Sequence, residues 1–325
     1  MTTDKSERLT KRVDIDEKSL EYARANVKSN NLEHRINIVA RKPDGPMIPL
    51  KELNIRSIDF TMTNPPFYSS AEDLLQSAAQ KSRPPHSACT GTDTEMVTPG
   101  GEVAFVLRIL EESLVLRDRV QWYTAMFGFL SSVSKIVERL RQENVDNFAV
   151  TEFVQGSKTR RWAVAWSFGG MRPSNAVARG MKPSAAKNIL PPITETSIIQ
   201  LPLDSKIGEI ADSLAASIGQ LDLLRWDWDK EKLEGVGRAP DNVWNRAWRR
   251  KKKKMEIEAS QAGGQTGAAP ALEAGGKPFG FKVSLHVGRE HIDVAAQWLE
   301  GHDASDFESF GGYLKATITS LSTAK

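Results

Sequence analysis

The regular alternation of strand-like and helix-like segments in the first half of the chain constrains the fold most. Residues 17–30 place apolar side chains near every 3.6 positions, as an amphipathic helix does, and residues 35–40 and 57–63 are short strand-like runs. A helix over 102–117, a strand over 120–127 and a helix over 131–142 follow. Strands over 147–154 and 161–168 flank the turn-forming sequence Q-G-S-K-T-R. The pattern predicts an open α/β sheet that ends in an antiparallel hairpin.

The sequence changes character after Gly169 and predicts a second, smaller domain. We expect domain one over 1–170, a polar linker over 171–193, and a small α+β appendage over 194–325. The appendage should contain strands over 194–203, 279–287 and 291–298, and helices over 205–221, 241–255 and 306–320. Its insert over 258–277 is rich in Gly, Ala and Gln, a composition typical of disorder.

Composition excludes several classes of protein. The single cysteine, Cys89, allows no internal disulfide and favours a reducing compartment. No apolar run of about 18 residues is present, so we expect no membrane partner. The five histidines lack the spacing of metal ligands, so we expect no metal. These features predict a soluble intracellular protein, in the nucleus or the cytoplasm.

The predicted strand over 57–63 ends in the sequence Asn64-Pro65-Pro66-Phe67. Ligands of open α/β sheets bind beyond the carboxyl ends of the strands. Two prolines make a rigid corner that lacks backbone donors. The Asn64 side-chain oxygen and the Pro65 carbonyl could accept both N–H groups of a planar amine whose ring stacks on Phe67. Such bonds free the nitrogen lone pair, and positioning then supplies much of the rate. The alternative is a proline turn that merely follows a core strand.

This corner resembles the N-P-P-[FYW] motif of S-adenosylmethionine-dependent amino-group methyltransferases. Further blocks narrow the resemblance: V-D-I-D-E-K-S-L-E-Y-A-R-A-N-V-K-S-N-N-L (13–32), P-P-H-S-A-C-T-G with E-M-V-T-P-G-G-E (84–102), and T-E-F-V-Q-G-S-K-T-R-R-W-A-V-A-W-S-F (151–168). Over residues 13–170 the chain is similar to the methyltransferase-like protein 16 family. That family includes the bacterial 23S ribosomal RNA enzyme and the eukaryotic U6 small nuclear RNA enzyme, both adenine-N6 methyltransferases.

The resemblance implies a class I, Rossmann-like S-adenosylmethionine-dependent RNA (adenine-N6)-methyltransferase. Asp14 would hold the cofactor ribose, and Asn64 would border the cofactor as well as the substrate. The catalytic corner would be Asn64, Pro65, Pro66 and Phe67, with the adenine amino group on Asn64 and Pro65. RNA contacts would come from Arg83 in the loop 69–99 and from Lys158, Arg160 and Arg161 in the hairpin.

A basic run, R-A-W-R-R-K-K-K-K, occupies residues 246–254. We expect Arg249, Arg250, Lys251 and Lys252 to contact RNA phosphates, although a nuclear import signal has the same composition. The alternative is a solvated helix end, where cations are favoured by the C-terminal dipole. Trp244 and Trp248 lie four positions apart, which favours packing in the core over stacking on bases.

The resemblance begins at the second strand of the family's sheet. A class I methyltransferase has a first strand and a Gly-rich turn for the methionine part of the cofactor. No glycine precedes Asp14. The missing strand should lie between the strands that end at Asp14 and Asn64, and its loss exposes apolar faces and unpaired edges. Each buried unpaired group costs about 1–3 kcal/mol, which over a strand exceeds a typical stability of about 5–15 kcal/mol. We therefore expect a sequence truncated at its N-terminus, the alternative being a degenerate relative.

Three functions follow as hypotheses. The leading one is methyl transfer to adenine N6 of ribosomal or U6 small nuclear RNA. The second is a non-catalytic RNA-binding relative that has lost the cofactor site. The third is an enzyme with the same corner that acts on guanine N2 or on a protein glutamine amide.

Overall fold

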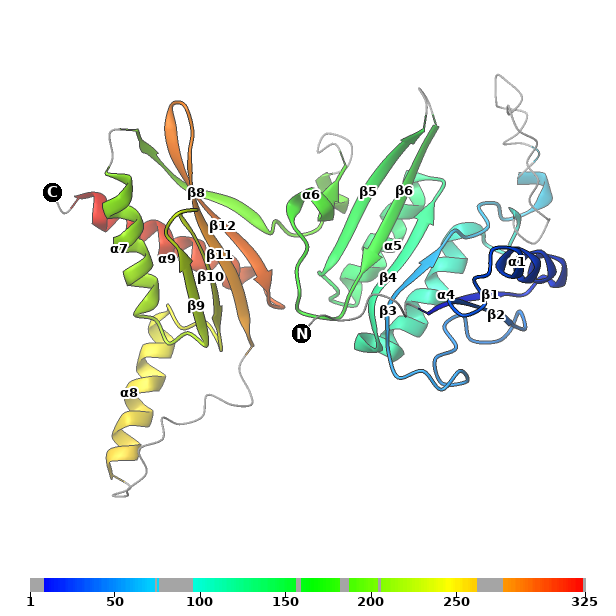
Figure 1. Cartoon of the computed structure of the whole chain (residues 1–325), viewed down its shortest axis with the longest axis horizontal. Coiled ribbons are helices and arrows are strands. Elements are labelled where there is room, and N and C mark those ends of the chain that lie inside the picture. The colour runs from blue at the N-terminus through cyan, green and yellow to red at the C-terminus, as the bar shows by residue number, and fades with distance from the viewer. Residues whose placement is uncertain are drawn as a thin grey trace. The chain divides into compact units, whose positions relative to one another are not determined.

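The computed structural model describes residues 9–73, 75, 96–155, 159–181, 187–203, 206–261 and 277–323 (Figure 1). The chain divides into two compact units, Met1–Val137 with Val154–Trp162, and Glu138–Phe153 with Ala163–Lys325. No helix within the described ranges is long and apolar enough to cross a bilayer.

The chain begins with a parallel βαβ unit. Strands β1 (Thr10–Asp14) and β2 (Ile36–Ala40) pair in parallel as a two-stranded sheet. Helix α1 (Glu17–Ser29) connects them and buries Leu20, Ala23 and Val27. It begins where the Asp16 carboxylate accepts a hydrogen bond from the Ser19 amide at 2.8 Å.

A five-stranded sheet follows, with the order β3-β4-β6-β5-β7. Its strands are β3 (Ile58–Thr63), β4 (Val120–Phe127), β5 (Phe148–Gln155), β6 (Thr159–Trp166) and β7 (Arg179–Gly180). Its helical segments are α4 (Gly101–Leu116), the 3-10 turn η1 (Arg117–Arg119), α5 (Leu130–Gln142) and α6 (Asn175–Ala178). Strands β3 and β4 are parallel, and β4 alternates buried side chains, as a strand covered by α4 and α5 should. The predicted α/β fold is confirmed, with most boundaries within two residues.

Strand β3 lies at one edge of its sheet within the described part of the chain, and β1 belongs to the other sheet. Phe60 and Met62 on β3 are 61% and 82% exposed. The sequence predicted unpaired edges and exposed apolar faces on the strands that end at Asp14 and Asn64. Within the described residues, the unpaired edge of β3 and its two exposed side chains agree with that prediction.

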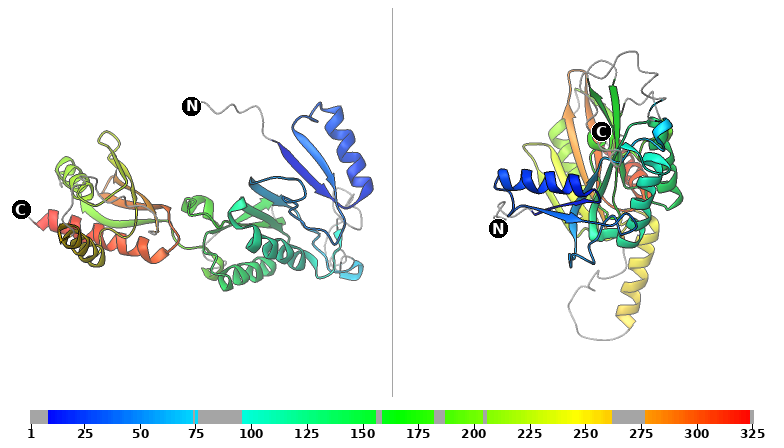
Figure 2. Two further views of the ribbon diagram at one scale, coloured as in Figure 1. Left: turned by 90° about the horizontal axis from the view of Figure 1, so that it is seen from below. Right: turned by 90° about the vertical axis from the view of Figure 1, so that its right-hand side faces the viewer.

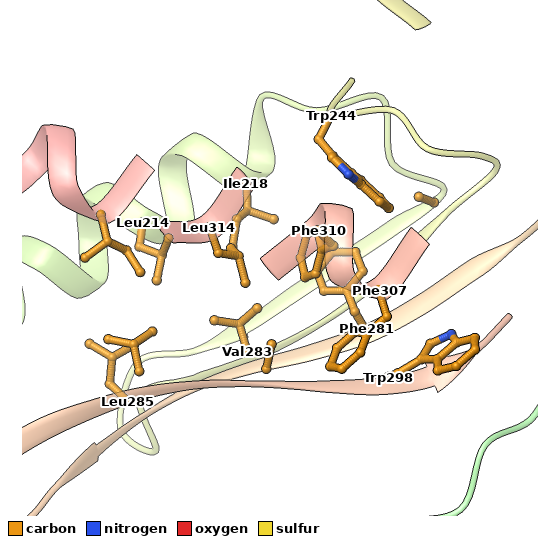
Figure 3. Close-up of a cluster of buried hydrophobic side chains, with 14 of the residues drawn as sticks. Leu214, Ile218, Trp244, Phe281, Val283, Leu285, Trp298, Phe307, Phe310 and Leu314 are labelled. Carbon is orange, nitrogen blue, oxygen red and sulfur yellow. The ribbon is translucent and has the colours of Figure 1, made fainter. Parts of the chain in front are cut away.

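The appendage is an antiparallel sheet with the order β8-β12-β11-β10-β9, covered by two helices (Figure 1). Its elements are β8 (Glu195–Pro202), α7 (Ile207–Gly219), β9 (Arg225–Asp229), β10 (Glu234–Ala239), α8 (Arg246–Gln261), β11 (Phe279–Val287), β12 (His291–Glu300) and α9 (Ala304–Thr323), after the 3-10 turn η2 (Lys187–Ile189). Figure 3 shows α7 and α9 contributing Leu214, Phe310 and Leu314 to a core with Val283 of β11. Helix α8 extends beyond the end of this sheet (Figures 1 and 2).

The sequence prediction missed the hairpin of β9 and β10. Gly235 and Gly237 interrupt the apolar pattern of β10. Position 237 requires glycine, because a Cβ there would lie 2.3 Å from the Phe281 ring. Residues 258–261 were predicted as disordered, but they form the end of α8, which extends past its basic run to Gln261. The remainder of that predicted insert, up to residue 276, lies outside the described residues. The domain boundaries at 170 and 194 stay predictions.

Candidate active site

The Asn64–Phe67 corner follows the carboxyl end of β3. Pro65 and Pro66 are buried, Phe67 is half-buried and Asn64 is exposed. None of the described residues donates a hydrogen bond to the Asn64 side chain or to the Pro65 carbonyl. Each proline lacks a backbone donor of its own. The corner therefore presents two hydrogen-bond acceptors beside an aromatic ring.

The backbone beyond the corner is held by a parallel bridge and a glycine pair. The Tyr68 amide donates to the Met96 carbonyl at 3.1 Å, and the Thr98 amide donates to the Tyr68 carbonyl at 3.0 Å. Gly100 and Gly101 have φ angles of 77° and 63°, and a Cβ on Gly101 would lie 3.3 Å from the Phe67 carbonyl oxygen. The glycine pair forms a turn, in which the Gly101 amide donates to the Thr98 carbonyl at 2.8 Å. The turn brings the first residues of α4 beside Phe67.

A buried carboxylate supports this corner. Glu102 is 2% exposed and accepts hydrogen bonds from the Gly128 amide at 2.7 Å and the Phe129 amide at 3.2 Å. A Cβ on Gly128 would lie 3.0 Å from Cδ1 of Phe67, so the turn that Glu102 holds packs against the ring. Burial raises the pKa of Glu102, while Ser132, the two amides and the charge of Arg161 oppose that rise. Sequence reasoning missed Glu102. Its only signal in the sequence was its position as an acidic residue in the first turn of an amphipathic helix.

Two predicted site residues that are far apart in the sequence, Phe67 and Arg161, lie close together here. The Arg161 guanidinium carbon lies 5.2 Å from the centroid of the Phe67 ring, a cation–π distance. Arg160 precedes it on β6 with an exposed side chain. The predicted RNA contacts Arg83 and Lys158 lie outside the described residues.

Asp14 ends β1, where the sequence predicted a cofactor ribose contact. Its Oδ1 accepts from the Ile15 amide at 2.8 Å and the Asp16 amide at 3.1 Å, while Oδ2 has only Arg12, at 3.5 Å, as a partner among the described residues. Oδ2 thus has capacity to accept from a ribose hydroxyl, which fits that part of S-adenosylmethionine. No glycine precedes Gly45 in the sequence, so the described residues around Asp14 offer no Gly-rich turn for the methionine part. No hydrogen bond or ion pair joins Asp14 to the Asn64–Phe67 corner among the described residues.

The basic run lies in the N-terminal half of α8. Arg249, Arg250 and Lys251 are exposed, whereas the Lys252 ammonium donates to Asp222 at 2.6 Å. The alternative of a stabilised C-terminal helix end is wrong, because α8 runs from Arg246 to Gln261 and its dipole disfavours cations near its start.

The tryptophans near this run serve the fold. Trp244 is 6% exposed and packs 4.9 Å from the Phe279 and Phe310 rings, and the Trp248 indole donates to Asp222 at 2.8 Å. The prediction that both tryptophans pack in the domain is confirmed. In the part of the chain that the structure describes, no cluster of three or more His, Cys, Asp or Glu could hold a metal.

Comparisons with known proteins identify relatives. A family model described as RNA methyltransferase matches residues 9–170. The U6 small nuclear RNA (adenine-(43)-N(6))-methyltransferase of Schizosaccharomyces pombe is 34% identical over 299 residues, which cover 91% of this chain and 69% of that protein. The mouse RNA N(6)-adenosine-methyltransferase METTL16 is 40% identical over 159 residues, 48% of this chain and 28% of that protein. A crystal structure of the human METTL16 catalytic domain with the MAT2A 3′UTR hairpin 1 is 36% identical, covers 49% of this chain and 55% of that one, and gives a TM-score of 0.44.

The fission-yeast match covers 91% of this chain and so includes most of the appendage, whereas the mouse match covers 48% of it. The chain spans 69% of the fission-yeast protein but less than a third of the mouse protein. The match to the fission-yeast enzyme includes both units described above. This chain belongs to the METTL16 family of RNA methyltransferases.

Proposed function

We propose that the chain is an S-adenosylmethionine-dependent RNA methyltransferase that acts on the N6 amino group of an adenine. The observation that carries the proposal is the corner itself, where the Asn64 side chain and the Pro65 carbonyl accept no hydrogen bond from the described residues and lie beside the half-buried Phe67. The names of the fission-yeast and mouse relatives support adenine N6 as the acceptor.

The chemistry of the corner is recognition of an amine. The two N6 hydrogens would be donated to Asn64 Oδ1 and to the Pro65 carbonyl, with the adenine ring on Phe67. These bonds draw the nitrogen towards tetrahedral geometry and direct its lone pair away from the ring. S-adenosylmethionine, when bound, supplies the methyl group, and Asp14 would hold its ribose. One N6 proton is lost to solvent after the transfer, so no general base is required during it, and fixed dipoles and alignment lower the barrier.

We infer that the RNA phosphates are contacted by cationic side chains of the hairpin and of α8. Arg160 and Arg161 lie on the hairpin beside the corner, and Arg249, Arg250 and Lys251 lie on α8. Lys252 would contribute less, since Asp222 already pairs with it. Arg83 and Lys158 remain proposed contacts on the resemblance alone. The placement of cations against the dipole of α8 supports a role in binding, because it brings the helix no stability.

The substrate we propose is a nuclear RNA of the U6 type, and the location is the nucleus, by analogy with the fission-yeast relative. Ribosomal RNA is the alternative substrate. The test incubates the chain with the methyl donor and either RNA, digests the product and identifies the nucleosides by mass spectrometry. N6-methyladenosine from the U6 RNA supports the proposal. N2-methylguanosine in place of N6-methyladenosine would contradict it.

A non-catalytic RNA-binding role is the second candidate. It is favoured by the placement of Asp14 and the corner in separate sheets within the described residues. Calorimetry separates the two functions: RNA binding without any affinity for S-adenosylmethionine would favour the second.

A further inference from the structure

The ring that we assign to base stacking is already covered by a cation. The Arg161 guanidinium carbon lies 5.2 Å from the Phe67 centroid, within the range of about 6 Å at which cations are attracted to ring faces. Arg161 is half-buried on β6, and its Nη1 donates to the Arg160 carbonyl at 2.9 Å. A base that stacks on this face of Phe67 has to displace the guanidinium.

The surroundings explain why the guanidinium lies there. Glu102 is a buried carboxylate whose two oxygens accept from backbone amides, and it forms no ion pair among the described residues. Its turn packs against Phe67 at Gly128. The charge of Arg161 lowers the pKa of Glu102, against the larger opposite effect of burial. Arg161 is thus drawn by the ring face and by the field of a carboxylate behind it.

We propose that Arg161 is a gating residue, which covers the stacking face of Phe67 in the absence of RNA and leaves it when an RNA base binds. The proposal rests on the proposed base-stacking role of Phe67. A phosphate adjacent to the target base offers the guanidinium charge-assisted, bidentate hydrogen bonds, which are stronger than an exposed cation–π contact. A base that carries a phosphate can therefore open the site, whereas a free nucleoside has to compete with Arg161.

The gate makes the site selective for polynucleotides over nucleosides. The same arginine inhibits binding of a base without phosphate and favours binding of a base within RNA. Removing it should therefore change the two affinities in opposite directions. A residue that only contacts phosphate, or only supports the fold, would not produce this pair of effects.

The experiment uses the full chain and two fluorescent probes that are quenched when the base stacks. One is 2-aminopurine riboside, which has no phosphate, and the other is a short RNA with 2-aminopurine at its centre. We expect Arg161→Ala to bind the riboside about two- to fivefold more tightly, the factor that an exposed cation–π contact represents. The same variant should bind the RNA more weakly. The matched control Arg160→Ala, one residue earlier on β6, should weaken RNA binding and leave riboside binding unchanged.

Further variants keep the outcomes separable. Arg161→Met preserves length and packing, so it replaces the alanine variant if that variant loses its cooperative melt. Phe67→Ala should abolish riboside quenching. If quenching depends on Phe67 but Arg161→Ala and Arg161→Met leave riboside affinity unchanged or weaker, the gate is overturned and the stacking role stands. If the riboside is quenched by neither the wild type nor the Arg161 variants, the stacking role falls and the gate with it.

Discussion

At the scale of residues, the role that we propose for Asn64 is chemical, and we expect its side chain to add little to the stability of the corner. Its side chain is exposed and accepts no hydrogen bond from the described residues. We expect Asn64→Ala to lower the methyl-transfer rate on the order of 10²–10³-fold, as loss of one preorganised polar group does elsewhere. The free energy of unfolding should change by less than about 0.5 kcal/mol.

The measurement is single-turnover methyl transfer with a thermal melt alongside. Asn37→Ala, an exposed asparagine on β2, is the matched control and should leave the rate unchanged. Near-normal turnover by Asn64→Ala would remove Asn64 from the proposed mechanism.

The burial of Glu102 leads to a prediction about how stability depends on pH. Because burial raises its pKa in the folded chain, the folded state binds the proton more tightly than the unfolded state. Its contribution to stability is therefore full below the unfolded pKa, about 4.3, and declines as pH rises towards the folded pKa. Glu102→Gln removes this titration but forces an amide NH₂ towards one of the two backbone donors. We expect the variant to be the less stable protein at pH 4 and to lose less stability than the wild type between pH 4 and 7.

Urea unfolding at several pH values provides the measurement. A constant difference in unfolding free energy between Glu102→Gln and the wild type would show that the pKa of Glu102 does not change on folding.

These residues also show what a sequence can reveal about a site. The corner was predicted because its four residues are adjacent and proline chemistry is local. Glu102 was not, because its role depends on burial against Gly128, which is 26 positions away in the chain. The contact between Arg161 and Phe67 likewise arises only when β3 and β6 join one sheet.

At the scale of elements, two glycines with opposite surroundings predict opposite effects. A Cβ at Gly237 in β10 would lie 2.3 Å from the Phe281 ring, whereas a Cβ at Gly312 in α9 would meet no atom within 4 Å. We expect Gly237→Ala to lower the free energy of unfolding by about 1–3 kcal/mol through overpacking. Gly312→Ala should raise it by up to about 1 kcal/mol, because alanine favours the helix.

Chemical denaturation of the two variants measures the sign of each change in the free energy of unfolding. Stabilisation by Gly237→Ala would mean that β10 and β11 do not pack as described.

The glycines also explain why the β9–β10 hairpin escaped prediction: Gly235 and Gly237 make room for aromatic rings, so tertiary packing overrides the local strand pattern. By contrast, β4 was predicted at its observed bounds, because its sequence is rich in β-branched and aromatic residues and contains no glycine or proline.

At the scale of the whole molecule, the net charge is only +3, although helix α8 carries a dense run of cationic side chains. Binding of RNA by α8 should be visible as salt dependence, since each neutralised phosphate releases counterions. Replacing Arg249, Arg250 and Lys251 together with Gln should lower RNA affinity. It should also reduce the slope of log affinity against log salt by up to about 2, taking about 0.7 for each contact to a single strand.

The control for this effect lies within the same helix. Lys252→Gln removes a charge that Asp222 already neutralises, so it should change the salt slope less than any one of the three exposed cations. Circular dichroism should show that the triple variant keeps its helix, because loss of cations near the start of α8 relieves an unfavourable dipole interaction. If the triple variant binds RNA with the wild-type salt slope, α8 does not contact phosphate. RNA affinity would then rest on other cations, with Arg160 and Arg161 on the hairpin the first to test.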